Sequence, residues 1–229
     1  MDQEPSNRFQ EIISELRMVF TGRGKLLDSL IPPLVFLVCN AIFGLNIALW
    51  ASVGTALLIG LLRAFKRQPL IYAFGGLGGI LVAVIITRIL GRAEGFFLPG
   101  LLTGSLTFLL CLVSLLLKRP LVAWTSYLTR RWPLEWYWHA RVRPAYSEVT
   151  LAWTLFFGLR LLLQLGLFWQ GAAQALGWVQ LLTGWPALVI LLIASYLYGL
   201  WRLANLGGPS VEEFKSGTPP PWQGQKRGF

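Results

Sequence analysis

Arg160 and Gln164 are polar residues within a long apolar segment, LAWTLFFGLRLLLQL. They are four positions apart, so on a helix their side chains lie on one face, one turn from each other. A guanidinium group in apolar surroundings needs hydrogen-bond acceptors, water or an anion, and an amide can bond to it without neutralising it. The pair therefore predicts a polar site that could hold an anion or a lipid headgroup.

The stretch GRAEGFFLPG places Arg92 and Glu94 between two apolar segments, with Arg88 one turn upstream. No Asp or Glu lies inside an apolar segment. Glu94, at the end of one such segment, is therefore the carboxylate expected at the membrane depth closest to that of Arg160. Arg88 and Arg92 are competing partners for it. The predicted cluster is thus Arg88, Arg92, Glu94, Arg160 and Gln164, with a net positive charge. In the structural alternative, Arg160 bonds backbone carbonyls and ties helices together, while Glu94 caps a loop.

The segments that carry these residues have the composition of membrane spans. Only 13% of the 229 residues are charged, against about a quarter in an ordinary soluble domain. Five segments together contain one charged residue, Arg160: 29–62, 70–87, 96–117, 149–169 and 180–201. Because about 20 residues of helix cross the hydrocarbon core, the sequence predicts an all-α integral membrane protein.

The first apolar segment is long enough for two crossings only if both are short. Gly44-Leu45-Asn46 is the one plausible turn within it. It predicts either a short hairpin or a re-entrant helix at residues 30–43. The other spans are expected at residues 71–90, 96–117, 149–169 and 180–202, which gives about six transmembrane helices.

The distribution of basic residues favours six spans over five. With the N-terminus inside, all 20 Lys and Arg except Arg88, Arg92 and Arg160 fall on the inner side. This follows the positive-inside rule, whereas five spans would place the four basic residues before the first span outside. Both termini are therefore expected in the cytoplasm.

Three regions follow. Residues 1–28 form a cytosolic or interfacial segment whose residues 8–20 have one apolar face, typical of a helix on the membrane surface or on the protein's own loops. Residues 29–203 form the transmembrane domain, with an interfacial loop at 118–148. Residues 204–229 are rich in Pro and Gly and are predicted to be a disordered cytosolic tail.

The loop at 118–148 interleaves basic and aromatic residues. Trp prefers the headgroup zone and Arg is attracted to anionic lipid, so the loop predicts contact with the bilayer rather than with nucleic acid. The expected lipid contacts are Trp124, Arg130, Arg131, Trp132, Trp136 and Trp138.

No catalytic motif or metal-ligand spacing is present: His139 is the single histidine, and no cofactor is expected. The glycines of FGGLGG (Gly75–Gly79) indicate close helix packing more than an unwound ligand site. Three functions stay open: a non-catalytic protein supporting cell-envelope or membrane organisation, a small transporter or channel for an anion or amphiphile around Arg160, and, least favoured, an intramembrane enzyme acting on lipid. Other membrane proteins or a second copy of the chain are further candidate partners.

Several motifs in order, among them DSLIPPLVFLVCNAIFGL, GRAEGFFLPG, LVSLLLKRPLV and LAWTLFFGLRLLLQL, resemble a family of uncharacterised bacterial membrane proteins, the domain-of-unknown-function family DUF3159. That family is similar to the intracellular septation protein A group of inner membrane-spanning proteins, which shares the basic-Pro-Leu helix end and the Leu-Ala-Trp start of the fifth span. The resemblance covers about residues 26–203. It implies a helical multi-pass fold in the bacterial cytoplasmic membrane and implies no reaction.

Overall fold

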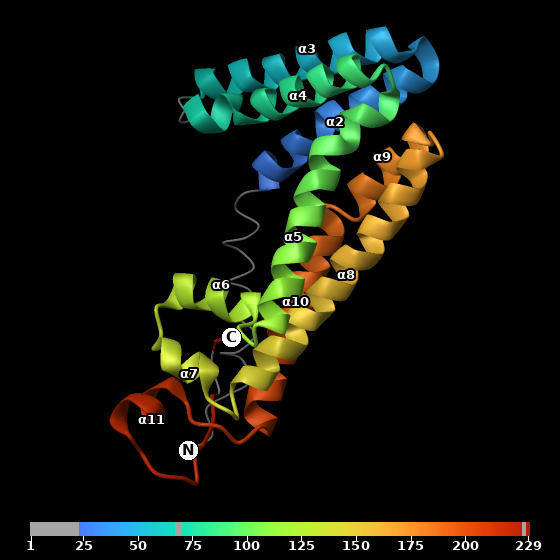
Figure 1. The fold of residues 1–229 in the computed structure, drawn as a ribbon. Helices are drawn as coiled ribbons and strands as arrows, with labels where there is room; N and C mark the ends of the chain where they lie inside the picture. The colour runs from blue at the N-terminus through green and yellow to red at the C-terminus, as the bar shows by residue number, and fades with distance from the viewer. Residues whose placement is uncertain (1–22, 67–69, 226–227) are drawn as a thin grey trace. The chain divides into compact units, whose positions relative to one another are not determined.

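The computed structural model of the protein describes residues 23–66, 70–225 and 228–229. Every regular element within these ranges is a helix, as drawn in Figure 1. The elements are α2 (Arg23–Phe43), α3 (Leu45–Phe65), α4 (Leu70–Leu90), η1 (Ala93–Phe97), α5 (Leu98–Leu116), α6 (Leu121–Arg130), α7 (Leu134–Trp138), α8 (Arg143–Trp169), α9 (Ala173–Leu182), α10 (Trp185–Asn205) and α11 (Val211–Ser216). The all-helical prediction is confirmed for the described residues. The amphipathic helix predicted at residues 8–20 lies outside them.

Four segments of the described chain are long and apolar enough to cross a membrane: Leu45–Phe65, Ala93–Leu116, Arg143–Trp169 and Ala173–Asn205. Two shorter apolar helical segments, Leu30–Phe43 and Gly75–Leu90, accompany them. The structure thus supports several candidate spans, in agreement with the membrane class predicted from composition.

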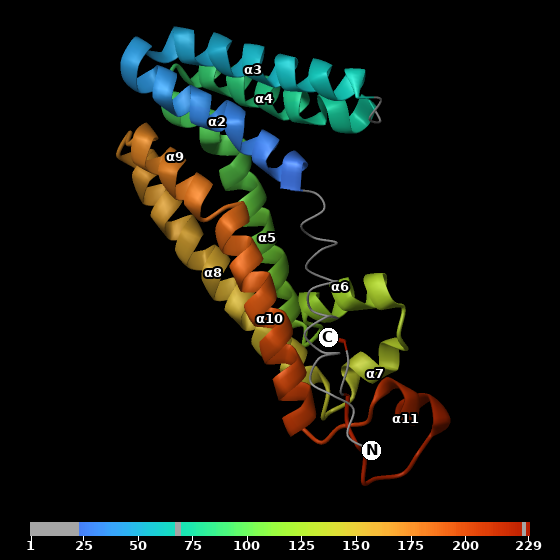
Figure 2. The same cartoon turned by 180° about the vertical axis from the view of Figure 1, so that it is seen from behind.

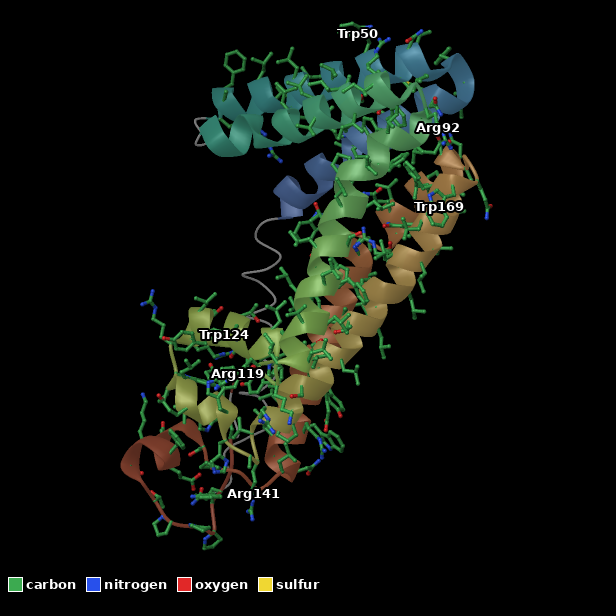
Figure 3. The ribbon with its side chains drawn as sticks, in the orientation of Figure 1. Trp50, Arg92, Arg119, Trp124, Arg141 and Trp169 are labelled. Atoms are coloured by element: carbon green, nitrogen blue, oxygen red, sulfur yellow. The ribbon has the colours of Figure 1, made fainter. Side chains whose placement is uncertain are left out.

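Large apolar side chains cover the outward faces of these helices. On α8, Leu155, Leu159 and Leu162 are 58%, 69% and 70% exposed and lie about one turn apart. Trp50 on α3 and Trp169 on α8, both labelled in Figure 3, are 70% and 77% exposed. Contiguous apolar surface of this kind is unfavourable in water and marks a membrane or protein interface.

The chain divides into two compact units. Of the described residues, the first unit contains 23–66, 70–99 and 171–177, and the second contains 100–170, 178–225 and 228–229. The division passes through α9, whose first residues belong to the first unit. Each unit has its own packing and is described by itself.

In the first unit, α2 and α3 form a hairpin with its turn at Gly44, as predicted. Gly44 has a φ of 81°, a left-handed conformation that suits a residue without a Cβ atom. The prediction of a short hairpin is wrong for α3, which has 21 residues and ends at Phe65. Helical hydrogen bonds do not stop where the apolar run stops: the Lys66 amide still donates to the Leu62 carbonyl, so Arg63 belongs to the last turn.

An aromatic contact joins η1 to α2 within this unit. The rings of Phe36 and Phe96 stack with centroids 3.9 Å apart, and Phe97 meets Phe36 edge-on at 5.6 Å. Gly177 of α9 packs against the same cluster, because a Cβ atom there would collide with Leu37 and Phe97. The turn after α4 is thereby held by side chains that are distant in sequence.

In the second unit, α5, α8 and α10 run alongside one another in both views (Figures 1 and 2). The Trp153 indole of α8 donates to the Ser195 hydroxyl of α10 at 2.8 Å. Nearer one end of the same two helices, the Arg202 guanidinium holds both carboxylate oxygens of Glu148, at 2.7 and 2.8 Å. These contacts clamp α8 to α10 at two levels.

Three segments expected to be irregular contain helices. Residues 118–148 contain α6 and α7, and most of residues 170–179, which separate the spans expected at 149–169 and 180–202, belong to α9. Composition indicated disorder for residues 204–229, but α11 lies there and begins with a capping box. The Ser210 hydroxyl accepts from the Glu213 amide, and the Glu213 carboxylate accepts from the Ser210 amide, which satisfies two backbone donors at the helix start.

The glycines of α4 do not mediate close packing among the described residues. A Cβ atom added at Gly75, Gly76, Gly78 or Gly79 would meet no atom within 4 Å. The close approach predicted from their spacing is therefore not observed, because no described helix contacts that face of α4.

Candidate functional site

The predicted polar cluster does not form one site within either unit. Arg88, Arg92 and Glu94 belong to the first unit, and Arg160 and Gln164 belong to the second. In the first unit, Arg92 Nε lies 3.4 Å from Glu94 Oε2. The Glu94 side chain is 7% exposed and that of Arg92 is 51% exposed. The 3-10 turn of η1 thus buries the carboxylate and leaves the guanidinium near the surface.

Gly171 lies against the Arg92–Glu94 ion pair. A Cβ atom there would lie 3.5 Å from Glu94 Oε1 and 3.6 Å from Arg92 Nη2, and its φ of 71° favours glycine. Arg88 has a different partner: its Nη1 donates to Asn46 Oδ1 at 2.9 Å, which links α4 to α3. The sequence predicts only a turn at Asn46, whereas in the structure this residue lies in the first turn of α3 and its amide oxygen accepts from the neighbouring helix.

The second half of the cluster lies on α8. Gln164 is 1% exposed, and among the described residues neither its Nε2 nor the buried Nε of Arg160 has a hydrogen-bond partner. The Oε1 atom of Gln180, on α9, is likewise buried and has no hydrogen-bond partner in the part of the chain that the structure describes. Gln180 was not predicted, because an isolated Gln at the edge of an apolar segment is not distinctive. These atoms retain hydrogen-bonding capacity in an apolar environment, where unmet capacity is costly.

The aromatic and basic residues of 118–148 form a packed structure with the tail, here called the aromatic module (residues 118–148, 203–225 and 228–229). Its buried core consists of Ala123, Trp136, Tyr137, Val142, Ala145, Tyr146, Leu203 and Val211. The Tyr137 hydroxyl shares a hydrogen bond with Ser126 at 3.1 Å. Burial raises the pKa of Tyr137, although the Ser126 hydrogen bond and Arg130 act in the opposite direction.

Trp136 is wrongly assigned as a lipid contact. Its side chain is wholly buried, and its Nε1 donates to the Pro209 carbonyl at 2.9 Å. Trp132 and Trp138 are half-buried against the same core, while Trp124 and Arg131 are exposed. The alternation of aromatic and basic residues could not show which aromatic side chains face inward.

Arginines stack on aromatic rings at the surface of this module. The distances run from the guanidinium carbon Cζ to the centroid of the tryptophan ring. They are 4.3 Å for Arg119 and Trp138, 5.1 Å for Arg130 and Trp132, and 5.6 Å for Arg141 and Trp222. Figure 3 shows Trp124, Arg119 and Arg141 on this part of the second unit. Cations held over aromatic faces give a surface that is both positive and amphipathic.

The second unit also contains a cavity of about 490 Å³. It lies among α5, α6, α8 and α10. Its lining residues are Thr107, Cys111, Leu121, Val122, Thr125, Ser126, Thr129, Arg130, Trp153, Leu192, Ser195, Tyr196 and Phe229. No sequence motif indicated this cavity, since its walls come from four helices and the tail.

No group of three or more His, Cys, Asp or Glu side chains in the described part of the chain is placed to hold a metal ion. The fold and these features define an all-helical protein with candidate membrane spans and a basic aromatic surface. A family model described as "Protein of unknown function (DUF3159)" matches residues 20–201, and the chain belongs to this family. No match was found among curated proteins or among solved structures.

Proposed function

We propose that this chain is a non-catalytic, multi-pass protein of the bacterial cytoplasmic membrane that supports membrane or cell-envelope organisation through contact with anionic lipid headgroups. The observation that carries the proposal is the set of arginines stacked on tryptophans at the surface of the aromatic module. Trp rings favour the headgroup zone, and each basic residue near an anionic surface contributes about 1 kcal/mol.

The proposed topology has six spans, with the aromatic module and both ends of the chain on the cytoplasmic side. It is supported by the positions of the basic residues, of which only Arg88, Arg92 and Arg160 fall elsewhere. The likeness to the intracellular septation protein A group supports the bacterial inner membrane as the compartment. Other membrane proteins or a second copy of the chain are the proposed protein partners.

Depth measurement tests the headgroup contact. Nitroxide labels are placed singly at Leu128, which is 70% exposed on α6, and at Lys215, which is exposed on α11, after Cys39 and Cys111 are replaced by alanine. In vesicles containing anionic lipid, the label at position 128 should report greater oxygen accessibility and lower accessibility to a polar nickel reagent than the label at 215. Equal, fully aqueous accessibility at both positions would contradict the proposal.

A second candidate function is passage or binding of an anion near Arg160. It is supported by Arg160 Nε and Gln164 Nε2 on one face of α8, which are buried and have no hydrogen-bond partner within the described ranges. Anion flux into proteoliposomes that falls on Arg160→Gln, and is unchanged by Arg88→Gln, would favour it. Absence of flux in the unsubstituted protein would remove it.

A further inference from the structure

The cavity of the second unit has the size and lining of a small-molecule site. Its volume of about 490 Å³ lies within the range of roughly 300–1,000 Å³ of ligand pockets. Leu121, Val122, Trp153 and Leu192 supply apolar wall, and Arg130 is the charged residue among the lining side chains. An apolar chamber with a cation in its lining is suited to an amphiphile with a negative head.

The hydroxyl groups of the lining are largely engaged by the protein itself. Thr107, Thr125 and Thr129 each donate to a backbone carbonyl one turn earlier in their own helices. The Ser195 hydroxyl accepts the indole N–H of Trp153. The walls are therefore less polar than their residue types suggest, and an anionic head would be recognised by the Arg130 guanidinium, whose N–H groups are directional donors.

Phe229 occupies the cavity with an apolar group and an oxygen acceptor, as such a molecule would. Its ring lines the cavity, stacks on Tyr146 with centroids 4.4 Å apart, and lies directly against Gly199, where a Cβ atom would collide with it. Its carbonyl oxygen accepts from Arg130 Nε at 3.3 Å. One residue thus places an apolar group in the chamber and an oxygen on the guanidinium.

We propose that this cavity binds a single-chain amphiphile with an anionic head, in which the acyl chain fills the chamber and the oxyanion pairs with Arg130. Such a ligand would displace Phe229. The exchange is favourable because a long acyl chain buries more apolar surface than one phenyl ring does. This site shares Arg130 with the proposed headgroup contact, where Arg130 stacks on Trp132, but its chamber lies among α5, α6, α8 and α10 rather than on the outer surface of the module.

Photolabelling of the full chain in membrane vesicles tests the proposal, with a diazirine-bearing palmitic acid as probe and peptide mass spectrometry as readout. Labels are expected at cavity residues such as Thr107, Trp153 and Leu192, and excess unlabelled palmitate should compete for them. Arg130→Gln should lower this labelling about tenfold, as expected for a lost charge-assisted hydrogen bond, and Arg130→Lys should restore part of it. Phe229→Ala should raise it, since the competing ring is removed.

Two matched controls separate the site from bulk lipid exposure. Arg131→Gln removes the neighbouring, exposed arginine that does not line the cavity, and should leave labelling unchanged. A diazirine hexadecanol has the same chain without charge, and its labelling should not respond to Arg130→Gln. Labelling that is not saturable and equally strong at the outward-facing Leu155 and Leu162 would overturn the proposal. Fatty-acid labelling unaffected by both Arg130→Gln and Phe229→Ala would overturn it as well.

Discussion

The indole Nε1 of Trp136 donates a 2.9 Å hydrogen bond to the carbonyl oxygen of Pro209, and Trp136 is wholly buried. The bond joins α7 to the segment that follows α10, across 73 residues of sequence. Edge-on contacts of the same indole with Tyr137 and Tyr146 complete its environment. Trp136 therefore ties the tail to the aromatic module.

Trp136→Phe should destabilise the folded protein by about 1–3 kcal/mol, because the Pro209 carbonyl would be left buried without its donor. Chemical unfolding of the purified chain in detergent, followed by near-ultraviolet circular dichroism, measures this change. Trp124→Phe is the control and should have little effect, since Trp124 is partly exposed. Equal stabilities for the two variants would show that the hydrogen bond contributes nothing.

Glu94 should couple energetically to Arg92, because their charged atoms lie 3.4 Å apart and the carboxylate is largely buried. In a double-mutant cycle, Glu94→Gln and Arg92→Gln are expected to show a coupling of about 1 kcal/mol, at the low end because Arg92 is half exposed. A parallel cycle of Glu94→Gln with Arg160→Leu tests the alternative pairing predicted from depth. A larger coupling in that second cycle would assign Glu94 to Arg160.

The tail should loosen as the pH falls. The Glu213 carboxylate accepts from the amides of Gln223 and Ser210, at 2.8 and 2.7 Å, and these hydrogen bonds lower its pKa, that from Gln223 most. Because the folded pKa lies below the unfolded value of roughly 4.3, the stabilisation is present above that value and is lost as pH drops through the folded pKa.

Hydrogen exchange of the Gln223 and Ser210 amides between pH 6 and pH 3, corrected for intrinsic exchange, measures this loss of protection. Glu213→Gln should reduce protection at pH 6 and remove most of its pH dependence. Protection that is independent of pH in the unsubstituted protein would show that the carboxylate charge does not hold the tail.

The proposed six-span topology predicts on which side of the membrane an introduced cysteine can be labelled. Single cysteines are introduced into a chain whose Cys39 and Cys111 are replaced by alanine. Exposed positions are the most informative, since a buried cysteine reacts poorly from either side. A membrane-impermeant maleimide should label cysteines at Asn46, Arg92 and Gln170 in intact cells. It should label those at Lys66, Arg131 and Lys215 only after permeabilisation. Labelling of a cysteine at position 10 in intact cells would instead support five spans.

The apolar helices expected at 96–117, 149–169 and 180–202 were predictable from the sequence alone, and so was the turn at Gly44, whereas the length of α3 was not. Long apolar runs form helices in a membrane because every backbone N–H and C=O must be bonded within the segment, which is a local requirement. The glycine turn is local as well, since it depends on a left-handed φ at one residue. The distribution of basic residues predicts, in addition, on which side of the membrane each loop lies, and this topology stays a proposal.

The roles of the aromatic and polar side chains were decided by tertiary structure. Trp136 and Trp124 occur in similar basic, aromatic sequence, yet one is buried in the module and the other is partly exposed. Arg88 bonds to Asn46, 42 positions away, and Phe229 stacks on Tyr146 from the tail. Each of these depends on which distant segment fills the adjacent space, and residue spacing along one helix carries no information about that segment.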